Sequence, residues 1–220
     1  MTVDLLLREP NFVVANKPSG LSVHRGWDAS RDTVMSRLRD ELGTWVYPVH
    51  RLDRATSGAL VVALDPDTAS RFSESFRDGL VRKEYVALVR GTIREAGTID
   101  HPVLLESGER ADAITDYEPI AIARDRYTLV RVWPRTGRAH QIRRHMKHLS
   151  RHILGDTTYG DGRENRKLRE EVGLHRMALH ARAIALPHPE TGVVIEVLAP
   201  MPEDLRAPLI ALGFDPAILI

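Results

Sequence analysis

The sequence predicts an α+β fold, with a mixed, mostly antiparallel β-sheet flanked by helices. Short apolar runs separated by turn residues predict strands that pair as hairpins, and only a few segments have helical spacing. Hairpin strands with helices outside them are typical of this class. The 220 residues contain no repeat, low-complexity tract or long linker. They fit one domain or two closely joined lobes.

In the first half of the chain, three apolar runs predict strands, at residues 12–18, 59–64 and 81–90. The first ends at a proline turn. A helix is predicted between the second and third strands, from Asp65 and Pro66 through Phe76. An aspartate cap before a proline is typical of a helix start, and Gly79 is typical of the residue that follows a helix end.

In the second half, two strand pairs and two helices are predicted. Alternation over residues 114–123 and 126–133 predicts a hairpin around Arg124 and Asp125. Residues 181–188 and 192–200 flank further turn residues. Helical spacing returns at residues 138–149 and 203–212.

Composition excludes several classes of protein. Without cysteine, the chain can form neither disulfides nor thiolate metal sites. The first ten residues contain acids and lack the basic and apolar regions of a secretory signal. The apolar runs are also too short to span a bilayer. We therefore expect a soluble cytoplasmic protein with no membrane partner.

The charges are segregated along the chain, although the net charge is only +1. Between Asp125 and Asp156 there is no acidic residue, and this basic segment contains four histidines as well as eight cationic residues. These are Arg126, Arg131, Arg135, Arg138, Arg143, Arg144, Lys147 and Arg151. A solvated helical face usually mixes both signs, so the segment favours phosphate binding.

The most distinctive segment is HRLDRATSG, residues 50–58, in which Asp53 lies among three potential cations, His50, Arg51 and Arg54. Nearby positive charge favours the ionised form of an acid, so we expect Asp53 to be an anion suited to act as a nucleophile. Thr56–Gly58 predict a turn that leads into the strand at residue 59. On composition alone, a surface ion pair in a solvated turn is the commoner explanation of such a cluster.

HRLDRATSG resembles the catalytic motif of the RluA family of pseudouridine synthases. Four further segments resemble motifs of that family in the same order: NKPSGLSVH (16–24), RKEYVALVRG (82–91), TGRAHQIRRH (136–145) and ILGDTTYGD (153–161). Residues 160–181 resemble the TruC-type branch, the tRNA pseudouridine(65) synthases. One position departs from the family pattern, because His152 stands where members usually have proline.

The resemblance implies an RNA pseudouridine synthase with a central RNA-binding cleft. It implies one catalytic domain over residues 1–220, without the amino-terminal S4 domain of larger members. The reaction needs no cofactor, because nothing is gained or lost overall. We expect a monomer whose partner is RNA, with tRNA favoured over ribosomal RNA.

The resemblance also implies roles for individual residues. Asp53 is expected to act at the glycosidic carbon as nucleophile or base, and Tyr85 to stack on the uracil. Arg143 is expected to pair with Asp53, and Arg51 to enter the space that the flipped nucleotide vacates. The remaining expected RNA contacts are Arg54, Arg138, His140, Arg144, Lys147 and Arg151.

Two other sites and two rival functions are open to test. His145, His148 and His152 have helical spacing but no carboxylate among them, so we expect no metal. Ser57 lacks the flanking glycines of a hydrolase nucleophile elbow. A nucleosidase would need an acid such as Glu84, which should point to the opposite strand face from Tyr85. A non-catalytic RNA-binding module is the second rival.

Overall fold

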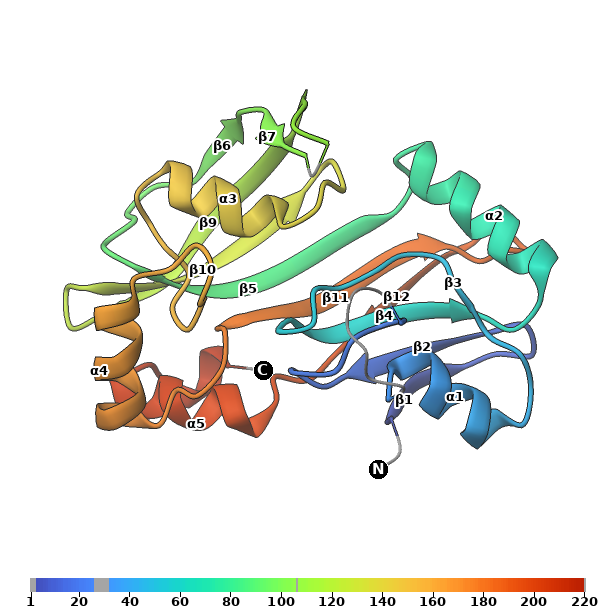
Figure 1. Ribbon diagram of the computed structural model, residues 1–220, viewed down its shortest axis with the longest axis horizontal. Helices are drawn as coiled ribbons and strands as arrows, with labels where there is room; N and C mark the ends of the chain where they lie inside the picture. The colour runs from blue at the N-terminus through green and yellow to red at the C-terminus, as the bar shows by residue number, and fades with distance from the viewer. Residues whose placement is uncertain (1–2, 26–31, 106, 220) are drawn as a thin grey trace. The chain divides into compact units, whose positions relative to one another are not determined.

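The computed structural model describes residues 3–25, 32–105 and 107–219, and the chain divides into two compact units. Unit 1 comprises Met1–Lys83 and Ala181–Pro200, and unit 2 comprises Glu84–His180 and Met201–Ile220. The chain passes between the units within two strands, β5 (Arg82–Arg90) and β11 (Leu179–Pro187). The predicted α+β class with a mainly antiparallel sheet is confirmed (Figure 1). The single catalytic domain and the central cleft stay predictions.

In unit 1 the strands follow the order β1 (Leu5–Arg8), β2 (Phe12–Lys17), β4 (Ser57–Ala63), β11 and β12 (Val194–Leu198). A short strand, β3 (Tyr47–Pro48), also pairs with β4. Every residue of β4 is buried, which explains why it is a continuous apolar run rather than an alternating one. Phe12 packs edge-on against Phe72 in the core of this unit, with ring centroids 5.1 Å apart.

Two capped helices belong to unit 1. In α1 (Val34–Leu42), the Thr33 hydroxyl accepts a hydrogen bond from the Ser36 amide, and the helix ends at left-handed Gly43. In α2 (Pro66–Arg77), Asp65 accepts the Thr68 amide, as the sequence predicted. Helix α1 was not predicted from the sequence, although its capping signal is present.

The sheet of unit 2 has the order β5, β10 (Tyr127–Pro134), β9 (Ile114–Ala123) and β6 (Gly97–Asp100). Between β6 and β9 in the chain, strands β7 (Val103–Leu104) and β8 (Arg110–Ala111) form a separate two-stranded sheet. Strands β9 and β10 form the predicted hairpin. Arg124 and Asp125 both have positive φ there, 52° and 45°, as a tight two-residue hairpin turn requires.

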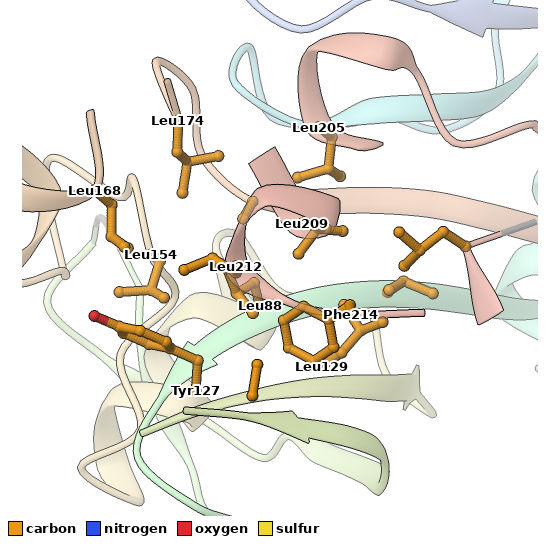
Figure 2. Packing of buried hydrophobic residues seen from close by; sticks show 14 of the residues in the cluster. Leu88, Tyr127, Leu129, Leu154, Leu168, Leu174, Leu205, Leu209, Leu212 and Phe214 are labelled. Atoms are coloured by element: carbon orange, nitrogen blue, oxygen red, sulfur yellow. The ribbon is translucent and has the colours of Figure 1, made fainter. Parts of the chain in front are cut away.

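The helices of unit 2 cover both faces of this sheet (Figure 1). Helices α4 (Gly162–Val172) and α5 (Glu203–Leu212) pack leucines against Leu88, Tyr127 and Leu129 (Figure 2), and a 3₁₀ turn follows at Pro216–Ile218. Helix α3 (Gln141–His148) lies over the other face. Since Val86 and Leu88 belong to the α4/α5 core, alternation along β5 directs Tyr85 to the α3 face.

The sequence predicted ten of these helices and strands to within a few residues, among them α5 with its observed bounds. It missed strands β1, β3, β6, β7 and β8, and helices α1 and α4. Helix α4 has a clear start and stop, with an Asp161 cap and left-handed Gly173. Among the residues described here, no helix is both long and apolar enough to cross a membrane.

Candidate active site and nucleic-acid interface

The loop that carries Asp53 is held by backbone hydrogen bonds within unit 1. The Thr56 amide donates to the Asp53 carbonyl over 3.0 Å, which closes a turn directly after the carboxylate. The Arg54 carbonyl accepts from the Gly20 amide and from Nζ of the fully buried Lys17. Segments 16–20 and 50–58 therefore form one hydrogen-bonded structure, with Asp53 half-buried at its tip.

His50, one of the three potential cations around Asp53, is not a cation at neutral pH. Its ring stacks on Phe76 at 4.9 Å, and its Nε2 accepts a hydrogen bond from the Val61 amide. Burial, followed by the nearby charge of Lys83, lowers the pKa of His50 to about 3. His50 is thus neutral at pH 7 and serves to anchor the loop on β4, which corrects the expectation that it contributes positive charge.

The two arginines of this loop are exposed and differ in what they contact. Arg54 donates from Nε to the Gly20 carbonyl at 2.9 Å, so its guanidinium also fastens the loop. Arg51 forms no hydrogen bond or ion pair within the described part of the chain. Its exposed cation is available to a ligand, and its predicted contact with RNA stays a prediction.

Gly58 fixes the turn that follows the loop. Its φ is +118°, and a Cβ at this position would lie 2.1 Å from the carbonyl oxygen of Ala181 on β11. No side chain fits there without moving a paired strand. The glycine of HRLDRATSG is therefore required by the close approach of β4 and β11.

Tyr85 lies on β5, half-buried, opposite Val132 of β10. Its neighbour Glu84 accepts a hydrogen bond from Nε1 of Trp133 at 3.2 Å, and its carboxylate lies 3.5 Å from Nε of Arg131. Trp133 and Arg131 point to the face away from α3, as alternation along β10 requires. Glu84 is therefore directed away from Tyr85, as predicted, which counts against a nucleosidase that uses Glu84 as its acid.

Arg143 of α3 forms a buried two-point ion pair with Asp156. Nε and Nη2 donate to the two carboxylate oxygens at 2.7 and 2.9 Å, and only 8% of the arginine side chain and 1% of the aspartate are exposed. The amides of Thr158 and Tyr159 donate to the same carboxylate. Burial opposes ionisation of Asp156, but the Arg143 guanidinium and these amides outweigh it and lower the pKa. The sequence did not predict this partner; the pairing of Arg143 with Asp53 stays a prediction.

The basic segment splits into two parts. Three of its arginines are neutralised by acids from elsewhere in unit 2: Arg126 by Glu164 at 2.6 Å, Arg131 by Glu118 at 2.7 Å and Arg135 by Asp116 at 2.6 Å. With Arg143, half of the eight cations are in ion pairs. The other four have no acidic partner among the described residues, and all were predicted RNA contacts: Arg138, Arg144, Lys147 and Arg151.

Tyr159 contacts two of these four cations, Arg144 and Lys147. Its hydroxyl accepts from Nε of Arg144 at 3.0 Å and lies 3.1 Å from Nδ1 of His140. The Arg144 guanidinium carbon and Lys147 Nζ lie 5.6 and 5.8 Å from the ring centre. His140 itself adopts a left-handed conformation with φ of 55° at the start of α3. Sequence reasoning missed Tyr159, and the GDTTY segment was its only signal.

The histidines tested as metal ligands have other roles. His145 is buried, donates from Nε2 to the His101 carbonyl and contacts Thr115 Oγ1 at 2.8 Å, and burial lowers its pKa. His148 stacks on the His101 ring at 3.9 Å. His152 donates from Nδ1 to the Tyr159 carbonyl, so the residue that replaces the family's proline closes this loop with its side chain.

Comparison with known proteins decides the family. Residues 11–148 match the family described as RNA pseudouridylate synthase. The chain belongs to this family. The matched range contains Asp53, Tyr85 and Arg143, whereas Asp156 and Tyr159 lie beyond it.

Relatives of this synthase cover nearly its whole length. It is 43% identical to the tRNA pseudouridine synthase C of Haemophilus ducreyi, over 90% of this chain and 91% of that protein. With the protein of the same name from Vibrio cholerae it shares 39% identity over 99% of each chain. Among solved structures it resembles Human RNA Pseudouridylate Synthase Domain Containing 4, with a TM-score of 0.79 and 27% identity, over 96% of this chain and 93% of that one.

Proposed function

We propose that this synthase converts a uridine of a tRNA into pseudouridine. The observation that carries the proposal is the similarity, over at least 90% of this chain, to proteins named tRNA pseudouridine synthase C. A tRNA substrate also fits a cytoplasmic location. We propose that the enzyme acts as a monomer on RNA.

The reaction breaks the bond between ribose C1′ and uracil N1, turns the base, and joins C1′ to C5. The proton that leaves C5 is replaced by one at N1, so the reaction needs neither a redox partner nor an energy source. We therefore propose a cofactor-free isomerisation. It requires a carboxylate at the sugar, an aromatic ring at the base and cations that bind the RNA backbone.

We propose that Asp53 is the nucleophile or base at the glycosidic carbon. The turn after it and the bonds from segment 16–20 give it a fixed backbone. Tyr85 is the proposed stacking partner of the uracil, which its half-buried position on the α3 face of β5 supports. Arg51 is the proposed residue that fills the space left by the flipped nucleotide.

Arg143 is proposed to hold Asp53 ionised and oriented. The pair with Asp156 uses Nε and Nη2 and so fixes the plane of the guanidinium, which supports an orienting role. The proposed RNA contacts are Arg138, His140, Arg144, Lys147 and Arg151, to which Arg54 adds a cation beside the Asp53 loop. A ribosomal RNA enzyme of the same family is the alternative for the substrate.

The catalytic assignment is tested with Asp53→Asn. The amide has the shape of the carboxylate but is neither nucleophilic nor basic, so we expect tRNA binding to persist and pseudouridine formation to be abolished. Product is measured by carbodiimide mapping of a tRNA transcript after incubation with each variant. The control is Asp67→Asn, at an exposed acid in the first turn of α2. Turnover by Asp53→Asn within about tenfold of wild type, ~1.4 kcal/mol in the barrier, would contradict the role.

The substrate is tested by mapping pseudouridine in the tRNA and ribosomal RNA of a strain that lacks the gene. Loss of one tRNA site, restored by the wild-type gene, supports the proposal. Loss of a site in ribosomal RNA alone would replace it with the alternative. Release of free uracil from the purified reaction, rather than isomerisation without change of mass, would indicate a nucleosidase.

A further inference from the structure

Tyr159 contacts both the acid of its own loop, Asp156, and the cations of helix α3. Its amide donates to Asp156, and its carbonyl accepts from Nδ1 of His152, so its backbone is fixed in the loop that follows α3. Its hydroxyl contacts Arg144 of α3 and His140, the residue that precedes α3. The backbone of Tyr159 is thus held by hydrogen bonds that do not involve the cations around its ring.

Three cations of α3 lie around this single ring. The guanidinium carbons of Arg143 and Arg144 are 4.9 and 5.6 Å from its centre, and Lys147 Nζ is 5.8 Å away. Contacts of this kind attract a cation to the aromatic face. Only Arg143 has a carboxylate partner, Asp156, whereas Arg144 and Lys147 have none in the described ranges of the chain.

Two like charges held close together without an acid repel each other, and an anion bound between them would remove that cost. Arg144 is also constrained in direction, because its Nε is used by the tyrosine hydroxyl. Since Nη1 of Arg144 is buried, a guanidinium held at Nε presents Nη2 in a fixed direction to a phosphate oxygen.

We propose that Tyr159 is a positioning residue that holds Arg144, beside Lys147, as a binding site for one phosphate group of the substrate RNA. The inference rests on the proposed function for the identity of the phosphate. The hydroxyl of Tyr159 acts on Arg144, and its ring also packs against Arg143. Loss of the hydroxyl and loss of the ring therefore have different effects.

The direct test is Tyr159→Phe, which keeps the ring and removes only the hydroxyl. We expect the affinity for tRNA to fall about tenfold, since a hydrogen bond to a charged group is lost, while the single-turnover rate at saturating tRNA changes far less. The salt dependence of binding should become shallower by about one unit in the logarithmic plot. Tyr159→Leu, which also removes the ring from Arg143, should lower the saturating rate as well.

A double-mutant cycle separates positioning from a general structural role. If Tyr159 acts through Arg144, adding Tyr159→Phe to Arg144→Gln should cause no further loss of affinity. Arg144→Lys keeps the charge but lacks the planar fork, so it should lose affinity as Tyr159→Phe does. Tyr47→Phe on β3 is the matched control, because it removes the hydroxyl of a half-buried tyrosine of unit 1 and should bind tRNA like wild type.

Independent, multiplicative losses in the cycle would overturn the inference, as would unchanged affinity of Tyr159→Phe. The test does not depend on catalysis. If wild-type protein forms no pseudouridine in tRNA but binds it with the expected dependence on Tyr159 and Arg144, the proposed function fails and this inference stands. If wild type is active and Tyr159→Phe binds normally, only this inference fails.

Discussion

The two halves of the basic segment both lack acidic residues and are rich in cations, but their electrostatic roles differ. In the β10 half, Arg126, Arg131 and Arg135 each lie within 3 Å of a carboxylate. In the α3 half, Lys147 and Arg151, like Arg138 and Arg144, have no acid partner in the part of the chain that the structure describes. The acids that separate the two halves come from β9 and α4, up to 38 residues away.

This difference shows that a run of cations along a chain does not define a basic surface. A guanidinium already bound to a carboxylate has little charge to offer a phosphate, and binding one would first require that the ion pair be broken. The unpaired cations of the α3 half have no such cost. We therefore infer that RNA meets the α3 half, whereas the arginines of the β10 half stabilise unit 2.

Arg143 breaks this division, because it belongs to the α3 half by position and is paired like the β10 arginines. Arg143→Met should produce the largest effect: a fall in turnover on the order of 100-fold or more, and a loss of about 3–5 kcal/mol of stability from unpaired, buried Asp156. Single-turnover rates and thermal unfolding measure the two consequences, and tRNA affinity is measured beside them for comparison with Arg144. Arg143→Lys should recover part of the rate, since a single charge replaces the fork incompletely.

The same substitution at Arg144 supplies the contrast. Arg144→Met should weaken tRNA binding and leave the free energy of unfolding close to that of wild type. A rate defect at Arg144 together with an affinity defect at Arg143 would show that the two roles are exchanged. A normal rate for Arg143→Met in folded protein would show that this residue has no part in the reaction.

The paired carboxylates predict how stability depends on acid. Burial alone would raise the pKa values of Asp156 and Glu164, but hydrogen bonds outweigh this effect. Asp156 accepts them from Arg143 and backbone amides, and Glu164 accepts them from Arg126 and Tyr127. The pKa values of the two acids therefore lie below their ordinary values of 3.8 and 4.5. A carboxylate whose pKa is lower in the folded state than in the unfolded state stabilises the protein at a pH above its unfolded-state pKa. This stabilisation is lost as the pH falls through the folded-state pKa. The free energy of unfolding should therefore decrease as the pH falls below about 4.5.

Denaturant titrations between pH 3 and 7 measure this dependence. Glu164→Gln keeps the shape of the side chain but cannot titrate, so its stability should fall less steeply in acid than that of wild type. If Glu164→Gln and wild type have parallel curves over this range, the ion pair of Glu164 contributes no pH dependence.

Much of the fold follows from local sequence, whereas the pairings within the site do not. The Asp65 cap and the β9–β10 turn were predicted because their signals lie within a few residues. The partner of Arg143 is 13 residues away, across a loop whose path the sequence does not specify. His50 was misjudged for the same reason, since its burial against Phe76 depends on how α2 packs. Helix α4 was missed despite its cap, because family motifs rather than helical spacing drew attention to that segment.

Salt-dependent tRNA binding tests the central claim most directly. Two double variants remove the same charge: Lys147→Gln with Arg151→Gln from the α3 half, and Arg131→Gln with Arg135→Gln from the β10 half. We expect the first to make the negative slope of log affinity against log salt shallower by about 1.5 to 2, and the second to leave it at the wild-type value. Equal slopes for the two variants, or a lower slope for the β10 pair alone, would contradict the account.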